Sequence, residues 1–305
     1  MYAEGRVVKM KTVKNENEEG NKMKKTGLFQ KVRKNRIMLL MLLPAIAYTV
    51  IFSYIPMTGI VLAFKKYNYH DGIYGSPWVG LKNFDYMIVS DKLWSLTRNT
   101  LLYNIAFIVL GIVFEVGFAI MLSEINNRIF KKVSQTVMFL PYFISWVVVS
   151  TVMLNIFGDN GVVNNILASI GGEPYSIYSH VKTWPIVMVC VRLWKQTGYG
   201  TVVYLAAIAG ISTEMYEAAE IDGANIWKKI TCITIPSLKP TIFIMALLAI
   251  GNIFRGDFGM FYQLVKNNQL LLETSDVIDT FVYRTMITTN DYGMSAACTS
   301  RFCAL

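Results

Sequence analysis

The chain is built from long apolar blocks separated by short polar segments. Residues 37–64 contain no charged side chain over 28 positions. A helix that rises about 1.5 Å per residue can cross a hydrocarbon layer of about 30 Å over that length. Further apolar blocks, the last two less clean, lie at 100–122, 133–157, 183–211 and 240–254. The pattern predicts an all-α membrane protein, a polytopic helical bundle with five spans.

Composition agrees with this prediction. Hydrophobic residues make up 54% of the 305 residues, charged residues only 16%, and the mean hydropathy is +0.41. The first block is preceded by 36 mostly polar residues and is longer than the apolar region of a secretory signal, although "AIA" at 45–47 looks like a cleavage site. We therefore expect an uncleaved helix.

Charge orients the predicted bundle. Residues 1–36 hold eleven Lys and Arg against four Glu, which is +7 of the formal net charge of +9. We interpret this segment as a basic cytoplasmic tail that meets anionic lipid headgroups, with no role in nucleic-acid binding. The loops at 123–132 and 212–239 are then cytoplasmic, and the loop at 158–182, which carries only Lys182, is external. Lys65 and Lys66 run against this rule, but two residues do not outweigh the tail, and long basic side chains can snorkel at either interface.

The loop at 212–239 is much longer than a connection between neighbouring helices requires. "EMYEAAEI" at 214–221 is rich in helix formers and can be capped by Ser212 or Thr213. Gly223 suits the end of that helix because it tolerates a positive φ. A second helical or extended segment should follow before Pro236. The sequence predicts a short helix and a turn on the membrane face.

The spacing within this loop resembles a known signature. Glu217-Ala218-Ala219, Gly223, Ile233 and Pro236 are similar to the "EAA…G…I-L-P" motif of permease subunits of binding-protein-dependent ABC importers, with Ile235 in place of the usual Leu. The segments "FLPYFISWVVVS" at 139–150, "EIDGAN" at 220–225 and "DVIDTFVYR" at 276–284 resemble the branch that imports oligosaccharides and polysaccharide fragments, with maltose-type sugar permeases among its members. The resemblance covers about residues 28–297.

The resemblance implies a type I importer fold and a set of partners. It implies a second homologous permease subunit, a cytoplasmic ATPase dimer and an extracellular sugar-binding protein that delivers an oligosaccharide, all at a bacterial cell membrane with the N-terminus of this chain in the cytoplasm. The chain contains no G-x-x-x-x-G-K-[ST] loop. We therefore expect a transport subunit that is no enzyme by itself and binds no cofactor, while the partner ATPase uses ATP and Mg²⁺.

The same resemblance assigns the ATPase contact to the loop. Glu217 would pair with a basic residue of the ATPase, the two alanines would permit close contact, and Gly223 would set the angle of the turn. Movement of the ATPase dimer would then switch the pathway between two openings. The residues implied in this contact are Tyr216, Glu217, Ala218, Ala219, Asp222, Gly223, Ala224, Ile233 and Pro236.

Candidates for the sugar pathway come from the apolar blocks. Sugar sites combine aromatic and polar side chains in a largely apolar cleft, and the last two blocks supply Trp194, Tyr199, Tyr204, Asn252 and Phe254. Packing between helices is the alternative role for each of them. Charges inside the spans are costly unless paired, and Glu115, Arg192 and Lys195 are such charges. They are either pathway residues or structural ion pairs, and a Glu115–Arg192 pair is one arrangement that the sequence allows.

Other chemistry is not indicated. His70 and His180 lie far apart in predicted external loops and suggest no metal site, and the four cysteines lack a C-x-x-C spacing, so free thiols are expected. We divide the chain into the tail at 1–36, a permease domain at 37–297 and an atypical segment at 298–305. The resembled family continues into a sixth helix after position 297. We interpret "CTSRFCAL" as a truncation or frameshift and expect weak assembly.

Two other functional classes remain open. A secondary sugar transporter would explain the apolar blocks, but it usually has more helices or paired repeats, and it gives no reason for the loop motif. Sensitivity of uptake to a proton ionophore at constant ATP would favour it. A membrane adaptor could use the loop to bind a partner, and it would show no sugar-dependent ATPase stimulation.

Overall fold

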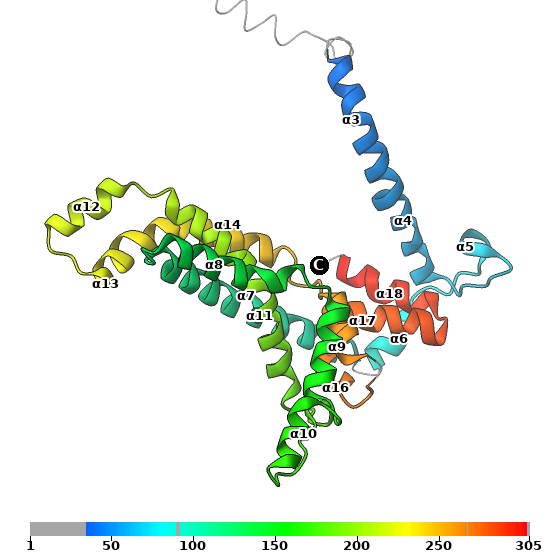
Figure 1. Ribbon diagram of the computed structural model, residues 1–305. Helices are drawn as coiled ribbons and strands as arrows, with labels where there is room; N and C mark the ends of the chain where they lie inside the picture. The colour runs from blue at the N-terminus through cyan, green and yellow to red at the C-terminus, as the bar shows by residue number, and fades with distance from the viewer. Residues whose placement is uncertain (1–34, 90–91, 267, 304–305) are drawn as a thin grey trace, which may run out of the picture. The chain divides into compact units, whose positions relative to one another are not determined.

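The computed structural model describes residues 35–89, 92–266 and 268–303 (Figure 1). The described residues are almost entirely helical, with one isolated antiparallel bridge between Lys65 and Trp78. They divide into two compact units, the first ending at Gly59 and the second beginning at Ile60. The predicted tail lies outside the described residues except for its last two positions, Asn35 and Arg36.

The first predicted span is a continuous helical segment, Arg36–Phe64. It consists of α3 (Arg36–Thr49), a π-helical turn (Val50–Tyr54), α4 (Ile55–Met57) and a 3-10 helix (Thr58–Phe64). The π turn comes just before Pro56, which has no N–H to donate and would clash with a regular preceding turn. The apolar side chains of α3 and α4 are exposed, as expected for a helix that faces lipid or another chain.

The second unit contains fourteen α-helices within its described residues. They are α5 (Gly72–Gly75), α6 (Lys82–Val89), α7 (Lys92–Ser123), α8 (Arg128–Phe139), α9 (Trp146–Phe157), α10 (Val162–Ser169), α11 (Trp184–Ala209), α12 (Thr213–Ile221), α13 (Ile226–Lys229), α14 (Ile235–Ile250), α15 (Phe258–Val265), α16 (Leu272–Ser275), α17 (Ile278–Arg284) and α18 (Tyr292–Cys303). Short 3-10 helices lie at Leu140–Phe143 and Ile177–Ser179, and π turns at Ile230–Thr234 and Thr285–Thr289.

Four helical segments of the described residues are long and apolar enough to cross a membrane. They are Arg36–Phe64, Lys92–Ser123, Trp146–Ser169 and Ile226–Ile250. The predicted block at 183–211 is present as α11, 26 residues long, but it is not among the four. Its charged and polar residues lower its hydropathy. The predicted fifth span at 240–254 was placed too late, because its helix begins at Ile226 and ends at Ile250.

The predicted third span at 133–157 is wrong as a single helix. The chain turns between α8 and α9, where Pro141 lies in the 3-10 helix and Ser145 caps α9 by accepting a hydrogen bond from the N–H of Val148. Gly198 of α11 lies against the end of α8. A Cβ atom there would come within 1.9 Å of the Met138 carbonyl oxygen, so the close approach of the helices requires glycine.

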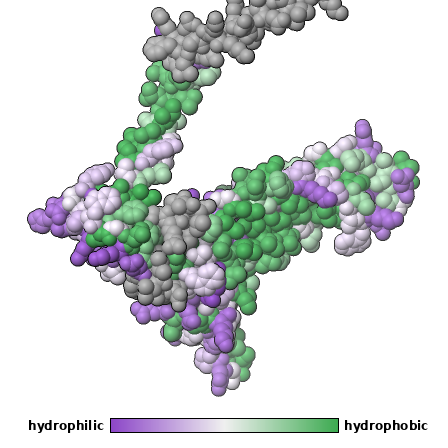
Figure 2. Space-filling model, turned by 180° about the vertical axis from the view of Figure 1, so that it is seen from behind, coloured by the Kyte–Doolittle hydropathy of each residue, from purple (hydrophilic) through white to green (hydrophobic). Residues whose placement is uncertain are grey.

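α7 and α11 form the most extensively packed helix pair of the second unit. The largest buried cluster lies between α7, α9, α11 and α15 and includes Tyr103, Trp184, Met188, Met260 and Phe261. A second cluster, of Ala119, Tyr204, Ile208 and Leu238, joins α7, α11 and α14. Figure 2 shows hydrophobic surface along the long helices of this unit and hydrophilic residues at its ends, as expected for a bundle in lipid.

Part of the atypical segment predicted at 298–305 is helical. Residues up to Cys303 belong to α18. Cys298 is buried in a third cluster with Leu96, Ile278 and Phe281, which come from α7 and α17. Lys65, which runs against the positive-inside rule, is held by the fold. Its side chain is buried, and its ammonium group donates to the carbonyl oxygen of Tyr74 at 2.5 Å instead of snorkelling to an interface.

Candidate functional site

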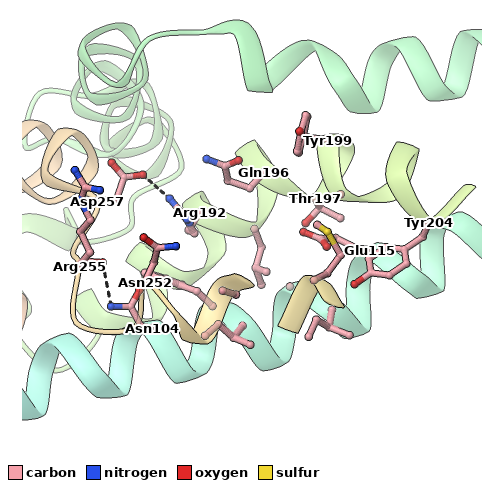
Figure 3. Close-up of a pocket in the computed structure, with 18 of the residues that line it drawn as sticks. Asn104, Glu115, Arg192, Gln196, Thr197, Tyr199, Tyr204, Asn252, Arg255 and Asp257 are labelled. Carbon is pink, nitrogen blue, oxygen red and sulfur yellow. Dashed lines mark hydrogen bonds and ion pairs between the residues drawn. The ribbon is translucent and has the colours of Figure 1, made fainter. Parts of the chain in front are cut away.

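A polar cavity of about 350 Å³ lies between α7, α11, α14 and the segment that follows α14 (Figure 3). We call it the central cavity. Its apolar lining includes Phe107, Ile108 and Met245. Charged, amide and hydroxyl side chains face the same space from α7, α11 and the segment after α14, an unusual concentration within apolar helices. These polar residues are Asn104, Glu115, Arg192, Gln196, Thr197, Tyr199, Tyr204, Asn252, Arg255 and Asp257.

An ion pair between Arg192 of α11 and Asp257 forms one end of the central cavity. The same Asp257 oxygen accepts a hydrogen bond from the Trp146 indole N–H at 3.2 Å, and the other oxygen caps α15 by accepting from the N–H of Met260 at 3.1 Å. The guanidinium group of Arg192 also lies 5.2 Å from the centre of the Phe107 ring. Arg192 therefore pairs with Asp257, and the Glu115–Arg192 pair is not formed.

The segment after α14 is fastened on both sides. The Asn104 side-chain amide of α7 donates to the Ile253 carbonyl oxygen at 2.8 Å. The N–H of Gly256 donates to a carboxylate oxygen of Asp279 at 2.5 Å, and a Cβ at position 256 would lie 2.8 Å from that oxygen. Burial raises the pKa of the Asp279 carboxyl, and the Gly256 hydrogen bond opposes this shift. The segment is thus held in position, while its residue Arg255 stays exposed.

Glu115 occupies the other end of the central cavity, near Thr197 and Tyr204 (Figure 3). It packs against Gly200 of α11, where a Cβ atom would lie 2.0 Å from the carboxyl carbon. The buried hydroxyl groups of Thr197 and Tyr204 have no hydrogen-bond partner among the described residues. Buried hydroxyls normally have one, so this end of the cavity has unused hydrogen-bonding capacity.

The structure separates the predicted pathway residues into two sets. Tyr199, Tyr204 and Asn252 line the central cavity, as do the predicted charges Glu115 and Arg192. The other three candidates, Trp194, Phe254 and Lys195, do not line it. Trp194 is 53% exposed and lies beside an apolar groove between α9 and α11.

Lys195 has a structural explanation. It is buried, and its ammonium group donates to the carbonyl oxygens of Tyr142 at 2.8 Å and Ile144 at 2.6 Å. These carbonyls lack helical partners because the chain turns there between α8 and α9. The lysine therefore satisfies a break in the backbone, a role that neither of the sequence alternatives for this charge included.

Five residues of the cavity lining were not predicted from the sequence, namely Asn104, Gln196, Thr197, Arg255 and Asp257. The sequence contains one signal for Arg255 and Asp257. "FRGDFG" at 254–259 interrupts the chain with two opposite charges directly after the fifth apolar block. Such a polar interruption is a reason to look for a cavity at the end of a span.

The second candidate site is the elbow, defined as residues 212–236. α12 ends in a complete Schellman motif: the N–H of Ala224 donates to the Ala219 carbonyl at 2.8 Å, and the N–H of Gly223 donates to the Glu220 carbonyl at 3.0 Å. Gly223 has a φ of +73°, as the motif requires. The predicted helix and its glycine end are confirmed as local structure.

Three side-chain contacts fix the elbow. The hydroxyls of Tyr216 and Thr234 share a hydrogen bond of 2.9 Å, and Glu220 forms an ion pair with Lys229. The Asn225 side chain caps α13 by accepting from the N–H of Lys228 at 2.9 Å. The second segment, whose form the sequence left open, is helical and continues into α14 through a π turn before Pro236.

The outer face of the elbow has no partner within the described residues. Glu217 and Ala218 are exposed, and Glu217 forms no ion pair there. Ile221 is 88% and Trp227 71% exposed. Asp222 and Pro236 are also exposed, whereas Ala219, Ala224 and Ile233 are partly buried. A rigid helix with exposed apolar side chains and an unpaired carboxylate is typical of a surface that binds another protein.

The chain matches a family of inner membrane transport components and is similar to several known proteins. The family described as "Binding-protein-dependent transport system inner membrane component" matches residues 108–260. Protein LplB of Bacillus subtilis is 33% identical over 267 residues, 87% of this chain and 83% of that protein. The polygalacturonan/rhamnogalacturonan transport system permease protein YteP of Bacillus subtilis is 32% identical over 279 residues, 90% of this chain and 86% of that protein.

Solved structures agree in fold. A chain in the crystal structure of a bacterial ABC transporter involved in the import of the acidic polysaccharide alginate superposes with a TM-score of 0.81 and 30% identity. The match covers 91% of this chain and 93% of that one. A second structure, of the alginate transporter in complex with an alginate pentasaccharide-bound periplasmic protein, matches with a TM-score of 0.78 and 30% identity over 89% and 90% of the two chains.

Proposed function

The chain belongs to the family of binding-protein-dependent transport system inner membrane components, and we propose that its central cavity is the passage for an imported oligosaccharide. The protein is a multi-pass membrane permease subunit of an ABC transporter, and ATP hydrolysis belongs to a separate subunit. The names of its relatives, which include transport systems for polygalacturonan and arabinooligosaccharides, support a sugar oligomer as the substrate.

The composition of the central cavity carries this proposal. The ring of Tyr199, which is 44% exposed, can contact the C–H faces of a sugar, and amides from Asn104, Gln196 and Asn252 can bond to its hydroxyls. Arg255 is exposed and forms no ion pair within the described residues, so a cationic group remains available to a ligand. A concentration of such groups among apolar helices is typical of a passage for a polar solute.

The elbow is the proposed contact with a cytoplasmic ATPase. The exposed face of α12 presents Glu217 for a basic partner, with Ala218 and Ala219 leaving room for close approach. The glycine at the end of α12 fixes the angle of the elbow. Because Tyr216 is bonded to Thr234, a displacement of α12 would be passed to the helix Ile226–Ile250, which lines the central cavity through Met245 and Ala249.

The proposed orientation places the elbow and the N-terminal tail in the cytoplasm. The basic tail supports this orientation by the positive-inside rule. A second permease subunit would complete the passage, and an external sugar-binding protein would deliver the substrate, as the complex with the alginate pentasaccharide-bound periplasmic protein suggests. We propose that the ATPase dimer uses ATP and Mg²⁺ and that this chain binds neither.

Co-purification tests the elbow. The chain is expressed with the second permease and the ATPase from its own operon, and wild type is compared with the double variant Glu217→Lys, Gly223→Asp. We expect the variant to lose the ATPase while the permease pair stays intact. The matched control is Glu173→Lys, Gly171→Asp, since Gly171 also has a positive φ, of +78°, and both residues are exposed in another loop. Equal loss of the ATPase in both double variants would refute the proposed role.

A further inference from the structure

A second polar cleft, of about 370 Å³, lies in the second unit where three segments distant in the sequence meet. We call it the tyrosine cleft. It shares no lining residue with the central cavity and none with the elbow. It is formed by the chain after the 3-10 helix Thr58–Phe64, by the start of α6, and by the turn before α18. Its lining residues are Lys65, Lys66, Tyr67, Val79, Lys82, Asn83, Thr289, Asn290, Asp291, Tyr292 and Gly293.

The walls of the tyrosine cleft are fixed by hydrogen bonds. The Asn83 side-chain amide donates to the carbonyl oxygens of Ala63 at 2.8 Å and Lys65 at 3.0 Å, which ties α6 to the first segment. α18 begins directly against this junction, because a Cβ at Gly293 would lie 2.7 Å from the Asn83 nitrogen. The cleft is therefore preformed, as small-molecule sites usually are.

Three tyrosine rings stand at this cleft. Tyr67 and Tyr292 line it, with ring centres 5.1 Å apart and planes inclined at 64°, and Tyr69 lies 5.4 Å from Tyr67 at 65°. The hydroxyls of Tyr69 and Tyr292 share a hydrogen bond of 3.0 Å. Because the rings meet edge to face rather than stacked, they do not cover one another, and Tyr69 is 74% exposed. The cluster leaves aromatic surface open to solvent.

The cleft also carries an excess of positive charge. Lys66 and Lys82 are exposed and form no ion pair within the described residues. Asp291 is the acidic residue that lines the cleft, and one of its oxygens accepts a hydrogen bond from the N–H of Met294. The ammonium group of Lys65 is occupied by the Tyr74 carbonyl. Two lysines thus remain available for an anionic ligand.

The tyrosine cleft lies at the end of the second unit remote from the elbow. α6 packs against α18 and leads into the start of α7, whereas the elbow follows the far end of α11 (Figure 1). If the elbow faces the cytoplasm, as proposed above, this cleft faces the outside. A solute arriving from the binding protein would meet the cleft before the central cavity.

We propose that the tyrosine cleft is an outer binding site for an oligosaccharide that bears carboxylate groups, such as a chain of uronic acids. Sugar C–H faces pack on the open tyrosine rings, the amide of Asn290 lies within the cleft for hydroxyl groups, and Lys66 and Lys82 pair with carboxylates. This inference rests on the proposed function, because it presupposes that the solute is a sugar oligomer.

A direct binding experiment tests the proposal without the ATPase. The full chain is placed in lipid nanodiscs, and trigalacturonate is titrated by calorimetry, with maltotriose as the neutral trisaccharide. We expect trigalacturonate to bind more tightly than maltotriose, and Tyr292→Ala and Lys82→Gln each to weaken trigalacturonate binding by about tenfold. Tyr292→Phe keeps the ring and loses only the bond to Tyr69, so it should retain binding.

Matched controls separate the cleft from a general surface effect. Tyr74→Ala removes a tyrosine that is 72% exposed and outside the cleft, and Lys182→Gln removes an exposed lysine from another loop. Both should bind trigalacturonate like wild type. Equal binding by wild type and Tyr292→Ala would overturn the proposal. So would a Tyr292→Ala variant that loses affinity only for the external binding protein, because the cleft would then be a protein contact.

The proposed function has its own readout. Uptake of an oligosaccharide by the complete transporter in vesicles, driven by ATP, is measured on the same variants. Uptake by wild type without any trigalacturonate binding at the cleft would overturn this inference and leave the proposed function in place. Trigalacturonate binding that depends on Tyr292 and Lys82 would support the inference whatever the uptake assay shows.

Discussion

Arg192 of α11 pairs with Asp257, 65 positions later in the chain, and the pair closes one end of the central cavity. The interaction joins a helix to the segment that follows α14, and Trp146 of α9 donates to the same carboxylate. One acidic residue therefore connects three elements around the proposed passage. The contact fixes the positions of both side chains at that end of the cavity.

The first prediction concerns this pair. Arg192→Gln leaves the Asp257 carboxylate without its cation, and Asp257→Asn leaves the guanidinium group unpaired, so each single change should reduce oligosaccharide uptake and lower the unfolding temperature in detergent. The double change Arg192→Gln, Asp257→Asn removes both charges. It should lower uptake and the unfolding temperature by less than the sum of the two single changes. Uptake in vesicles and thermal unfolding of the purified chain provide the double-mutant cycle. Additive effects would show that the two side chains act independently.

Gly200 gives a second prediction. Gly200→Ala places a methyl group where the Glu115 carboxyl lies, so the end of this flexible side chain must move, and we expect Gly200→Ala to be less stable than Gly117→Ala by up to about 1 kcal/mol. Adding Glu115→Ala should restore much of that loss by emptying the space. Gly117→Ala on α7 is the control, since a Cβ there meets nothing within 4 Å. A Gly200→Ala variant as stable as Gly117→Ala would contradict the packing described.

These two sites also show which features the sequence could predict. Glu115 and Arg192 were visible as charges inside apolar blocks, and the helix and turn of the elbow follow from neighbouring residues such as Gly223. The Arg192–Asp257 pair was not visible, because tertiary packing alone brings together residues that far apart in the sequence. Lys195 was predicted to be a pathway residue or part of an ion pair for the same reason. Its partners are backbone carbonyls of a turn that hydropathy does not reveal.

The span boundaries were predicted with uneven success. The first block ends where its charges begin, so its helix was bounded correctly. Pro141 was the local signal that the third block is interrupted, but a continuous apolar run concealed the turn. Pro236, by contrast, was predicted as a boundary of the helix although the helix does not end there. A π turn before it lets the helix continue from Ile226 to Ile250, so the last span includes residues that were predicted to belong to the loop.

A third prediction concerns the coupling path from the elbow. Tyr216→Phe removes the hydrogen bond to Thr234 and keeps the ring, so α12 should stay folded while its link to the helix Ile226–Ile250 weakens. We expect the ATPase to co-purify as with wild type, and uptake per ATP hydrolysed to fall about two- to fivefold, the size of a bond worth about 0.5–1 kcal/mol. Loss of ATPase binding in Tyr216→Phe would show that the residue acts in docking instead.

Cysteine reactivity supplies a fourth prediction. Cys298 is buried, and burial raises the pKa of its thiol to about 12, so almost none of it is thiolate at pH 8. Cys232 is exposed on the elbow. In a variant carrying Cys190→Ser and Cys303→Ser, a maleimide should label Cys232 within minutes and leave Cys298 unlabelled until the protein is denatured. Peptide mass spectrometry measures both. Fast labelling of Cys298 in the native chain would show that α18 does not pack as described.

The pH dependence of stability gives the last prediction, through Asp279. Burial raises the pKa of this carboxyl in the folded chain above its ordinary value, so the folded state favours the protonated form. The stability that this group contributes is present at low pH and is lost as the pH rises through the folded-state pKa. Asp279→Asn keeps an oxygen that can accept from the Gly256 N–H and cannot ionise.

The unfolding temperature of Asp279→Asn should therefore rise relative to wild type between pH 4 and pH 8. A relative stabilisation of 1 kcal/mol corresponds to about 2–4 °C for a chain of this size. The exposed Asp159→Asn is the control for a general effect of removing one negative charge. Thermal unfolding in detergent at the two pH values measures both differences. A relative stability of Asp279→Asn that falls with rising pH would mean that the ionised carboxylate stabilises the Gly256 segment by more than its burial costs.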